Sequence, residues 1–439
     1  MTKHDMSQVA LLDFHSENLA HAIQKAFPSL FPDSTHLKEE LDQYVFPRLD
    51  FMAGDERKSY LFLFEARYVE TEWKDMISMH YINTSYEVEN TVMRVHLFKK
   101  AELCEKNYRG CFTMRTIDEA HIMLSYIYPN WEYVVYNGNS LNVMTYRKKV
   151  HINGRIIEFH TYPLFVQDNT VVACAEASLI SMSKYLHSKY DYTKIRINSI
   201  NSAYHSNRTK SYPSSGLLPT QMLEILYKHN IQCGYQIYNE NSEFKEYIDY
   251  CIESAIPILI GICIANRQKG RGGHHVIQII GHSDVNTGKK YVVYDDSGYY
   301  LRNIGELARK KTSGFVGCVS WEVLSKSLKD GTSFIIYPIH EKVYILYDNF
   351  IKHMNDMLYR MHMNDSTLHE YVREEAKRLL QIDMPHYLWC CEYSMPAGSM
   401  LFIANPTYIR STTKNIFLNK DPLICKSQIS LLRYEENCP

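Results

Sequence analysis

The sequence has no long hydrophobic run, and this absence excludes a membrane-spanning helix. Crossing a bilayer takes about 18 or more consecutive apolar residues. The longest apolar stretch, AIPILIGICIA, is too short and predicts a buried strand instead. The first residues, MTKHDMSQVALLDFHSENLAHAIQKAF, also lack the apolar core of a signal peptide. We therefore expect a protein with no membrane association.

The sequence also has no large excess of positive or negative charge. Lys and Arg together number 48 and Asp and Glu number 49, which gives a formal net charge of −1. Because nucleic-acid-binding domains are usually strongly basic, we expect no nucleic-acid partner. The 11 cysteines follow neither metal-site nor disulfide-framework spacing. We therefore expect free thiols, a reducing cytoplasmic location, and no bound metal or other cofactor.

The chain contains enough hydrophobic residues to form the cores of several domains. Hydrophobic residues make up 45% of the 439 residues, and no internal repeat or low-complexity tract is evident. We predict an N-terminal α+β domain over residues 1–155, a central core over 156–333, and a C-terminal α+β region over 334–439 that packs on the core.

The first region should begin with helices over residues 1–50 and continue with strands. SYLFLFEARYVE and TVMRVHLFKK have the short β-type pattern of strands. Between later strands, TIDEAHIMLSYIY at residues 116–128 predicts a helix. In the central region helices come first and antiparallel strands follow, which indicates an α+β core rather than a doubly wound sheet.

A cysteine lies at the predicted start of the first core helix, in FVQDNTVVACAEASLISMSKYL. The N-terminus of a helix stabilises negative charge, so Cys174 is placed where a thiolate is favoured. The alternative is a buried structural cysteine, the commonest state of a free thiol. The inward face at Ala177, Ile180 and Met182 predicts a central, fixed helix.

Two later segments could supply the partners of this thiol. RGGHHVIQIIGHSD places His275 after a Gly-rich turn, at the start of a strand. YVVYDDSGYY places Asp295 and Asp296 at the far end of the next strand. Adjacent antiparallel strands would bring one of these carboxylates beside the ring, where it fixes the tautomer. The order Cys, His, Asp predicts nucleophilic catalysis, with the choice between the two aspartates open.

These motifs, in this order, resemble the papain-like cysteine peptidase superfamily. The nearest branch is the bacterial one that includes the double-glycine-leader peptidases of bacteriocin transporters and related peptidase-like proteins. The histidine block reads HVIQIIG here, from His275 to Gly281, which selects His275 over His274. The resemblance covers residues 156–300, about a third of the chain. It implies a central helix bearing Cys, packed on an antiparallel sheet bearing His and Asp.

The resemblance also implies a role for Gln167. In the superfamily a glutamine upstream of the cysteine donates its side-chain amide to the oxyanion hole, together with the cysteine N–H. Gln167 lies one position further from Cys174 than the usual spacing, and Asn169 is the alternative donor. An alignment with the leader peptidases favours Asp295 as the third catalytic residue, whereas a papain-like alignment favours Asp296.

The function implied is that of a cytoplasmic thiol hydrolase, a cysteine peptidase acting on a protein or peptide. The same residues would serve a deamidase or an acyl or amide transferase. The alternative from another class is a non-catalytic protein-interaction module on a degenerate peptidase fold. In either case the N-terminal domain is expected to recruit substrate or to bind a regulatory protein partner.

Overall fold

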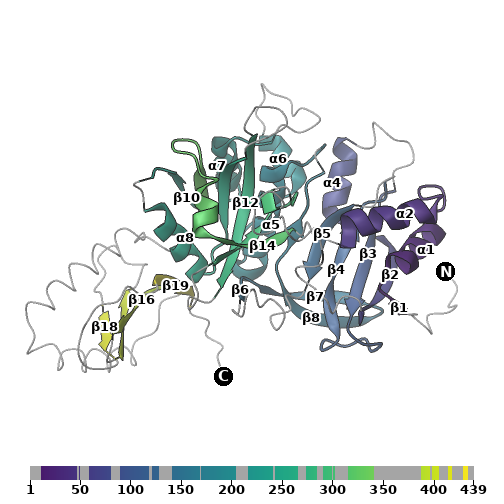
Figure 1. Cartoon of the computed structure of the whole chain (residues 1–439), viewed down its shortest axis with the longest axis horizontal. Helices are drawn as coiled ribbons and strands as arrows, with labels where there is room; N and C mark the ends of the chain where they lie inside the picture. Colours follow the sequence, from purple (N-terminus) through teal and green to yellow (C-terminus); the bar gives the residue numbers. More distant parts are fainter. Residues whose placement is uncertain are drawn as a thin grey trace, which may run out of the picture.

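The computed structural model shows a mixed α+β protein whose paired strands are all antiparallel (Figure 1). The residues that it describes are 11–46, 49, 59–80, 89–117, 121–127, 141–168, 170–203, 216–240, 243–264, 273–283, 290–298, 300–301, 315–340, 387–395, 398–404, 414–417 and 429–433. Of the helices in these ranges, none combines the length and the apolar character needed to cross a membrane.

A six-stranded sheet forms the N-terminal end of the described chain, at the right of Figure 1. Its order is β1 (Leu12–Asp13), β2 (Leu61–Tyr68), β3 (Val92–Phe98), β4 (Tyr108–Met114), β5 (Ile122–Ile127) and β9 (Leu164–Phe165). The helical prediction for residues 1–50 is confirmed in its described part by α1 (Ser16–Ala26), α2 (Ser34–Glu40) and the π-helix η1 (Leu41–Val45).

The helix predicted at residues 116–128 is wrong, because Ile122–Ile127 forms the strand β5. Every residue of β5 is buried, and the strand pairs with β4 on one side and β9 on the other. A short apolar run that is buried on both faces has no alternation to distinguish it from a helix. Because this segment pairs with a strand on each side, it forms a strand and not a helix.

The central sheet has the order β10 (Gln232–Ile237), β15 (Phe334–Ile339), β11 (Ile258–Ile264), β12 (Gly273–Ser283), β13 (Lys290–Tyr294) and β14 (Val316–Ser320). The strands predicted from IPILIGICIA, HHVIQIIGH and KYVVY are therefore confirmed as antiparallel neighbours. β15 lies between β10 and β11, so residues 334–339 belong to this sheet.

Helices flank the central sheet. They are α5 (Cys174–Tyr190), α6 (Ile197–Ala203), α7 (Pro219–Lys228), α8 (Phe244–Glu253) and α10 (Trp321–Ser325). Proline occupies the first position of α7, where its missing N–H needs no partner. The sequence predicts one helix that starts near Pro219 and another over FKEYIDYCIESA, and α7 and α8 confirm them.

Helix α5 is the most enclosed helix of the described core. Every residue from Ala175 to Leu186 is buried, including three serines. Ser181 Oγ accepts a hydrogen bond of 2.9 Å from the backbone N–H of Phe165. Ser183 Oγ accepts one of 2.6 Å from Ile195 N–H. Buried hydroxyls are tolerated when they are hydrogen-bonded, so these contacts fix α5 against the chain on either side of it.

The N-terminal and central sheets exchange strands. β9, immediately before α5, pairs with β5 in the N-terminal sheet. In the other direction, β6 (Leu141–Val143) pairs with β12 in the central sheet. The hairpin of β7 (Tyr146–Ile152) and β8 (Arg155–Thr161) lies between them in the chain. The predicted boundary at residue 155 falls at the first residue of β8, within this hairpin.

A four-stranded sheet follows near the C-terminus, with the order β18 (Lys414–Phe417), β17 (Gly398–Ala404), β16 (Tyr387–Met395) and β19 (Ile429–Arg433). In Figure 1 it lies beyond α8, at the opposite end from the N-terminal sheet. The helix predicted from DSTLHEYVREEAKRLLQI lies outside the described residues.

A buried ion pair joins the N-terminal region to the central helix. Glu72 lies on α4 (Thr71–Met79), and its Oε1 is 2.5 Å from Nζ of Lys184 on α5. The two side chains are 1% and 4% exposed. Burial raises the pKa of Glu72, but the charge of Lys184 outweighs burial and lowers it overall. The carboxylate is therefore ionised inside the protein, where it depends on its lysine.

We expect Lys184→Met to destabilise the fold by about 3–5 kcal/mol, because Glu72 is then left as an uncompensated buried charge. The double variant Lys184→Met/Glu72→Leu should recover most of that loss. Urea unfolding followed by circular dichroism measures both. The matched control is Lys245→Met, which breaks the exposed pair with Asp249 and should change stability by less than about 0.5 kcal/mol. Equal effects of the two single variants would contradict the prediction.

Candidate active site

Cys174 is the first residue of α5, and Ala173 is the extended N-cap residue before it. The entry to the helix is fixed by Glu176, whose Oε2 accepts a hydrogen bond of 2.5 Å from Ala173 N–H. The thiol is half-buried, whereas Cys111, Cys251 and Cys318 are buried. A thiol at this position lies beside the unpaired N–H groups of the first helical turn, which favour its anionic form.

Because side chains alternate along β12, His275 and His274 lie on opposite faces of the strand. His275 pairs with Ile262 of β11, and His274 pairs with Cys263. Successive side chains of a strand point to opposite faces. His274 is exposed on the other face, with Nδ1 3.7 Å from Cys263 Sγ. His275 is buried and is the histidine that reaches the aspartates.

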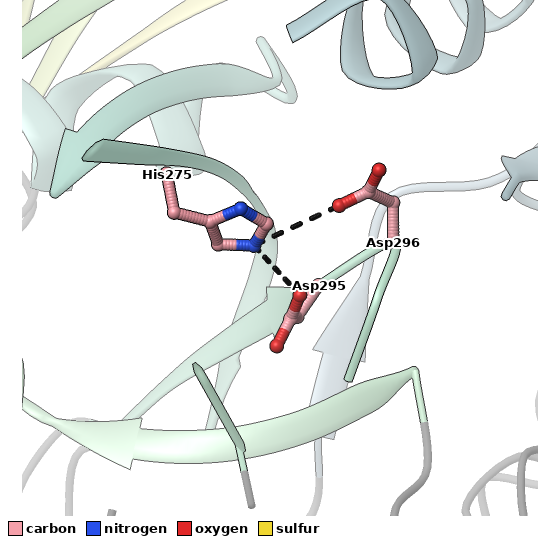
Figure 2. A group of neighbouring side chains, drawn as sticks. All are labelled: His275, Asp295 and Asp296. Carbon is pink, nitrogen blue, oxygen red and sulfur yellow. Dashed lines mark hydrogen bonds and ion pairs between the residues drawn. The ribbon is translucent and has the colours of Figure 1, made fainter. Parts of the chain in front are cut away.

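Asp295 is the closer of the two aspartates to the imidazole (Figure 2). Its Oδ1 lies 2.8 Å from His275 Nε2, whereas Oδ1 of Asp296 is 3.7 Å from the same nitrogen. Asp295 is also held in place by neighbours. Its Oδ1 accepts hydrogen bonds from Ser297 N–H at 3.2 Å and Ser297 Oγ at 2.9 Å. Its Oδ2 accepts one from Leu301 N–H at 3.1 Å.

The Cys174 thiol is one of the groups that raise the pKa of the His275 imidazole. Because Nε2 faces the carboxylates, Nδ1 is the ring nitrogen that remains available to a thiol. Burial lowers the pKa of His275, but the hydrogen bonds to Asp295 and Cys174 outweigh it and raise the pKa well above its ordinary value. Burial raises the pKa of Asp295, but the hydrogen bond and charge of His275, together with the hydrogen bonds from Leu301 and Ser297, reverse this to a net decrease. The arrangement favours an imidazolium beside the carboxylate of Asp295.

Asp296, the alternative candidate for the third catalytic residue, is a second acid beside the imidazole. It is 1% exposed, and within the described part of the chain neither carboxylate oxygen accepts a hydrogen bond of normal geometry. Burial raises the pKa of Asp296 to about 7, and the negative charge of Asp295 adds to this. Two carboxylates this close to one imidazole are not both fully ionised at neutral pH, so Asp295 carries the charge and Asp296 the proton.

The same three residues are also the ones that could hold a metal ion. Ligand atoms of His275, Asp295 and Asp296 lie within 4.8 Å of one another. A nitrogen and two carboxylate oxygens suit a divalent cation such as Zn²⁺. At 2.8 Å, however, Nε2 and Oδ1 of Asp295 are joined by a hydrogen bond, which an ion between them would have to replace. The geometry therefore fits the hydrogen-bonded dyad better than a metal centre.

Gln167, the residue predicted to serve the oxyanion hole, lies in the loop between β9 and α5. Gln167 is half-buried in this loop, and its backbone carbonyl accepts a hydrogen bond of 3.4 Å from Arg115 Nη2. The alternative donor, Asn169, lies outside the described residues. The sequence patterns did not predict the residues that hold the candidate site residues in place. These are Ser297 beside Asp295, and Arg115 and Asp168 beside Gln167.

A sequence signal exists for only some of these contacts. An aspartate in a loop before a helix commonly binds backbone N–H groups a few residues later, so Asp168 was recognisable as a loop-forming residue. Ser297 directly follows the two aspartates. Arg115 has no local signal, because its partners lie on a distant part of the chain and only the pairing of β5 with β9 brings them together.

A second thiol–imidazole pair lies inside the N-terminal sheet. Cys111 on β4 faces His96 on β3. Burial raises the pKa of Cys111, but the hydrogen bond and charge of His96 lower it overall. His96 Nδ1 is also 2.9 Å from the Tyr108 hydroxyl oxygen. Because Cys111 is 2% exposed, this pair is a much less accessible nucleophile than Cys174.

A scan against protein-family models and a search of curated proteins both found no match. The geometry of the site and the sequence pattern are therefore the features from which a function can be inferred.

The two aspartates can be distinguished by the pH dependence of Cys174 alkylation. Asp295→Asn removes the partner that raises the pKa of His275, so the imidazolium that supports Cys174 is lost at lower pH. We expect the pH of half-maximal labelling to move upward and the rate at pH 6 to fall about tenfold or more. Asp296→Asn should change that rate by less than about threefold, since its contact is longer. A larger effect of Asp296→Asn would reverse the assignment.

Proposed function

We propose that this chain is a cytoplasmic, papain-like thiol hydrolase, a cysteine peptidase that acts on a protein or peptide through Cys174, His275 and Asp295. The observation that carries the proposal is that one buried imidazole lies 2.8 Å from a carboxylate that is itself held by hydrogen bonds, while the thiol at the N-terminus of α5 raises the pKa of the same ring. A nucleophile, a base and a group that orients the base are the parts that acyl transfer needs. The described cysteines are free thiols, which suits a reducing compartment.

In the proposed cycle His275 takes the proton of Cys174, and the thiolate attacks the substrate carbonyl carbon. The C–S bond forms while the carbonyl electron pair moves onto oxygen. As that pair returns, the C–N bond breaks, and His275 gives its proton to the leaving amine. Water, deprotonated by His275, then attacks the thioester and releases the acid and the thiol.

The negative oxygen that forms during attack needs hydrogen-bond donors. The backbone N–H of Cys174 is one, as the first turn of α5 leaves it without a helical partner. The side-chain amide of Gln167 is the proposed second donor. One such donor contributes about 3 kcal/mol to lowering the barrier.

The related activities differ in the molecule that accepts the acyl group. Water gives a peptidase or, on a side-chain amide, a deamidase, whereas an amine gives a transferase. The non-catalytic alternative is disfavoured by Asp296, since a buried carboxyl that accepts no hydrogen bond costs about 1–3 kcal/mol that an inert binding module has no reason to retain. The role proposed for the N-terminal region is substrate or partner recognition by a part that shares strands with the core.

Alkylation with iodoacetamide at pH 6.5, followed by peptide mass spectrometry, tests the proposal. Cys174 should be modified at least about tenfold faster than any other cysteine, because it is partly exposed at a helix N-terminus and acts together with the imidazole of His275. Cys263 is the internal control, since it is also partly exposed and lies 3.7 Å from a histidine but belongs to no such triad. His275→Ala should bring Cys174 down to the rate of Cys263. Equal labelling of the two cysteines in the wild type would exclude the thiol-hydrolase assignment.

The substrate class is tested in cells. Proteomes of cells that express the wild type and Cys174→Ala are compared for protein termini. A peptidase should generate new termini only with the wild type. A deamidase would instead produce Gln-to-Glu or Asn-to-Asp changes, which the same spectra reveal.

A further inference from the structure

The loop that leads into Cys174 is attached to the N-terminal sheet by a buried arginine. Arg115 directly follows β4 and is 3% exposed. Its Nη1 lies 3.8 Å from Oδ2 of Asp168, and its Nη2 donates a 3.4 Å hydrogen bond to the carbonyl of Gln167. Both contacts are long, but the contact with Asp168 joins opposite charges in the protein interior, where screening by water is weak.

Asp168 in turn shapes the loop. Its side chain is fully buried, and its Oδ1 accepts hydrogen bonds from three successive backbone N–H groups, those of Thr170 at 3.1 Å, Val171 at 2.9 Å and Val172 at 2.7 Å. The Asp168 N–H donates to Val172 O at 3.1 Å, which closes the turn. A single carboxylate thus sets the conformation of the segment between Gln167 and the helix.

This segment ends at the nucleophile. Only Ala173 separates Val172 from Cys174, and Ala173 N–H is held by Glu176. The two proposed oxyanion donors, Gln167 and the Cys174 N–H, therefore lie at the two ends of one loop that Asp168 shapes and Arg115 fastens. Donors to a transition state must be placed accurately, since a displacement of about 1 Å costs about 100-fold in rate.

We propose that Arg115, acting through Asp168, is a positioning residue for the oxyanion side of the active site, supplied by the N-terminal sheet. This inference rests on the proposed thiol chemistry of Cys174 and adds a residue to it. The nucleophile side has separate supports, because His275 and Asp295 are held by β12, β13 and the turn at Ser297. Loss of Arg115 should therefore impair reactions that develop an oxyanion and leave other reactions of the thiolate intact.

Two reagents separate these reactions on the same thiol. With iodoacetamide the thiolate forms a C–S bond as iodide leaves with the C–I electron pair, so no oxyanion develops. With p-nitrophenyl acetate the thiolate adds to the carbonyl, the pair moves onto oxygen, and its return expels p-nitrophenolate. The first rate is followed by mass spectrometry, and the second by the absorbance burst of p-nitrophenolate.

We expect Arg115→Met to slow acylation of Cys174 by p-nitrophenyl acetate about 10- to 100-fold and to change iodoacetamide labelling less than about twofold. Arg115→Lys, which keeps the charge, should recover part of the acylation rate. The matched control is Arg147→Met, on the exposed hairpin strand β7, where the arginine is 68% exposed and pairs with Glu158. It should leave both rates unchanged.

A double-mutant cycle identifies the route of the effect. If Arg115 acts through Asp168, then Arg115→Met/Asp168→Asn should slow acylation no more than either single change, since one contact is lost only once. The double variant also removes both buried charges, so it serves if Arg115→Met alone fails to fold.

Equal losses in both reactions, or no loss in either, would overturn the positioning role. Additive losses in the cycle would show that Arg115 does not act through Asp168 and would overturn the route proposed here. Slow iodoacetamide labelling of Cys174 in the wild type would instead reject the thiol chemistry itself, and this outcome is distinct from the others.

Discussion

The hydrogen bond between Asp295 and His275 is the constraint on which the site depends. A carboxylate that is fully buried retains its charge only where donors surround it. Here the imidazole, the Ser297 side chain and two backbone N–H groups serve that purpose. The oriented ring then leaves its other nitrogen for the thiol at the start of α5. The placement of β12 beside β13, and of α5 against β12, follows from the same need to bring these groups together inside the core.

Sequence patterns predicted much of this arrangement, and the limits have physical causes. The apolar runs of β11 and β12 and the proline at the start of α7 carry their own local signals. Once β12 is identified as a strand, the two-residue alternation of its side chains places His275 and His274 on opposite faces. The choice between Asp295 and Asp296 depends on the turn after β13, where the period of the strand no longer applies. β5 was misread because burial on both faces removes alternation, and Arg115 was missed because its partners lie far away in the chain.

The presence of Asp296 makes the site electrostatically crowded. One positive ring faces two acids, and only one of them is stabilised by hydrogen bonds. Such an arrangement costs folding stability, and perturbed acids of this kind cluster at functional sites rather than in inert cores. The helix that carries Cys174 is in turn held by a buried ion pair with the N-terminal region.

The exchange of β6 and β9 between the two large sheets has a consequence for how the protein could be controlled. Many precursors are switched on when an N-terminal segment is cut away. Here such a cut would remove one edge partner of the histidine strand and would leave β9, the strand that leads to the nucleophile, without its own neighbour. Removal of the chain up to β6 would therefore take away strands that hold the segments bearing His275 and Cys174.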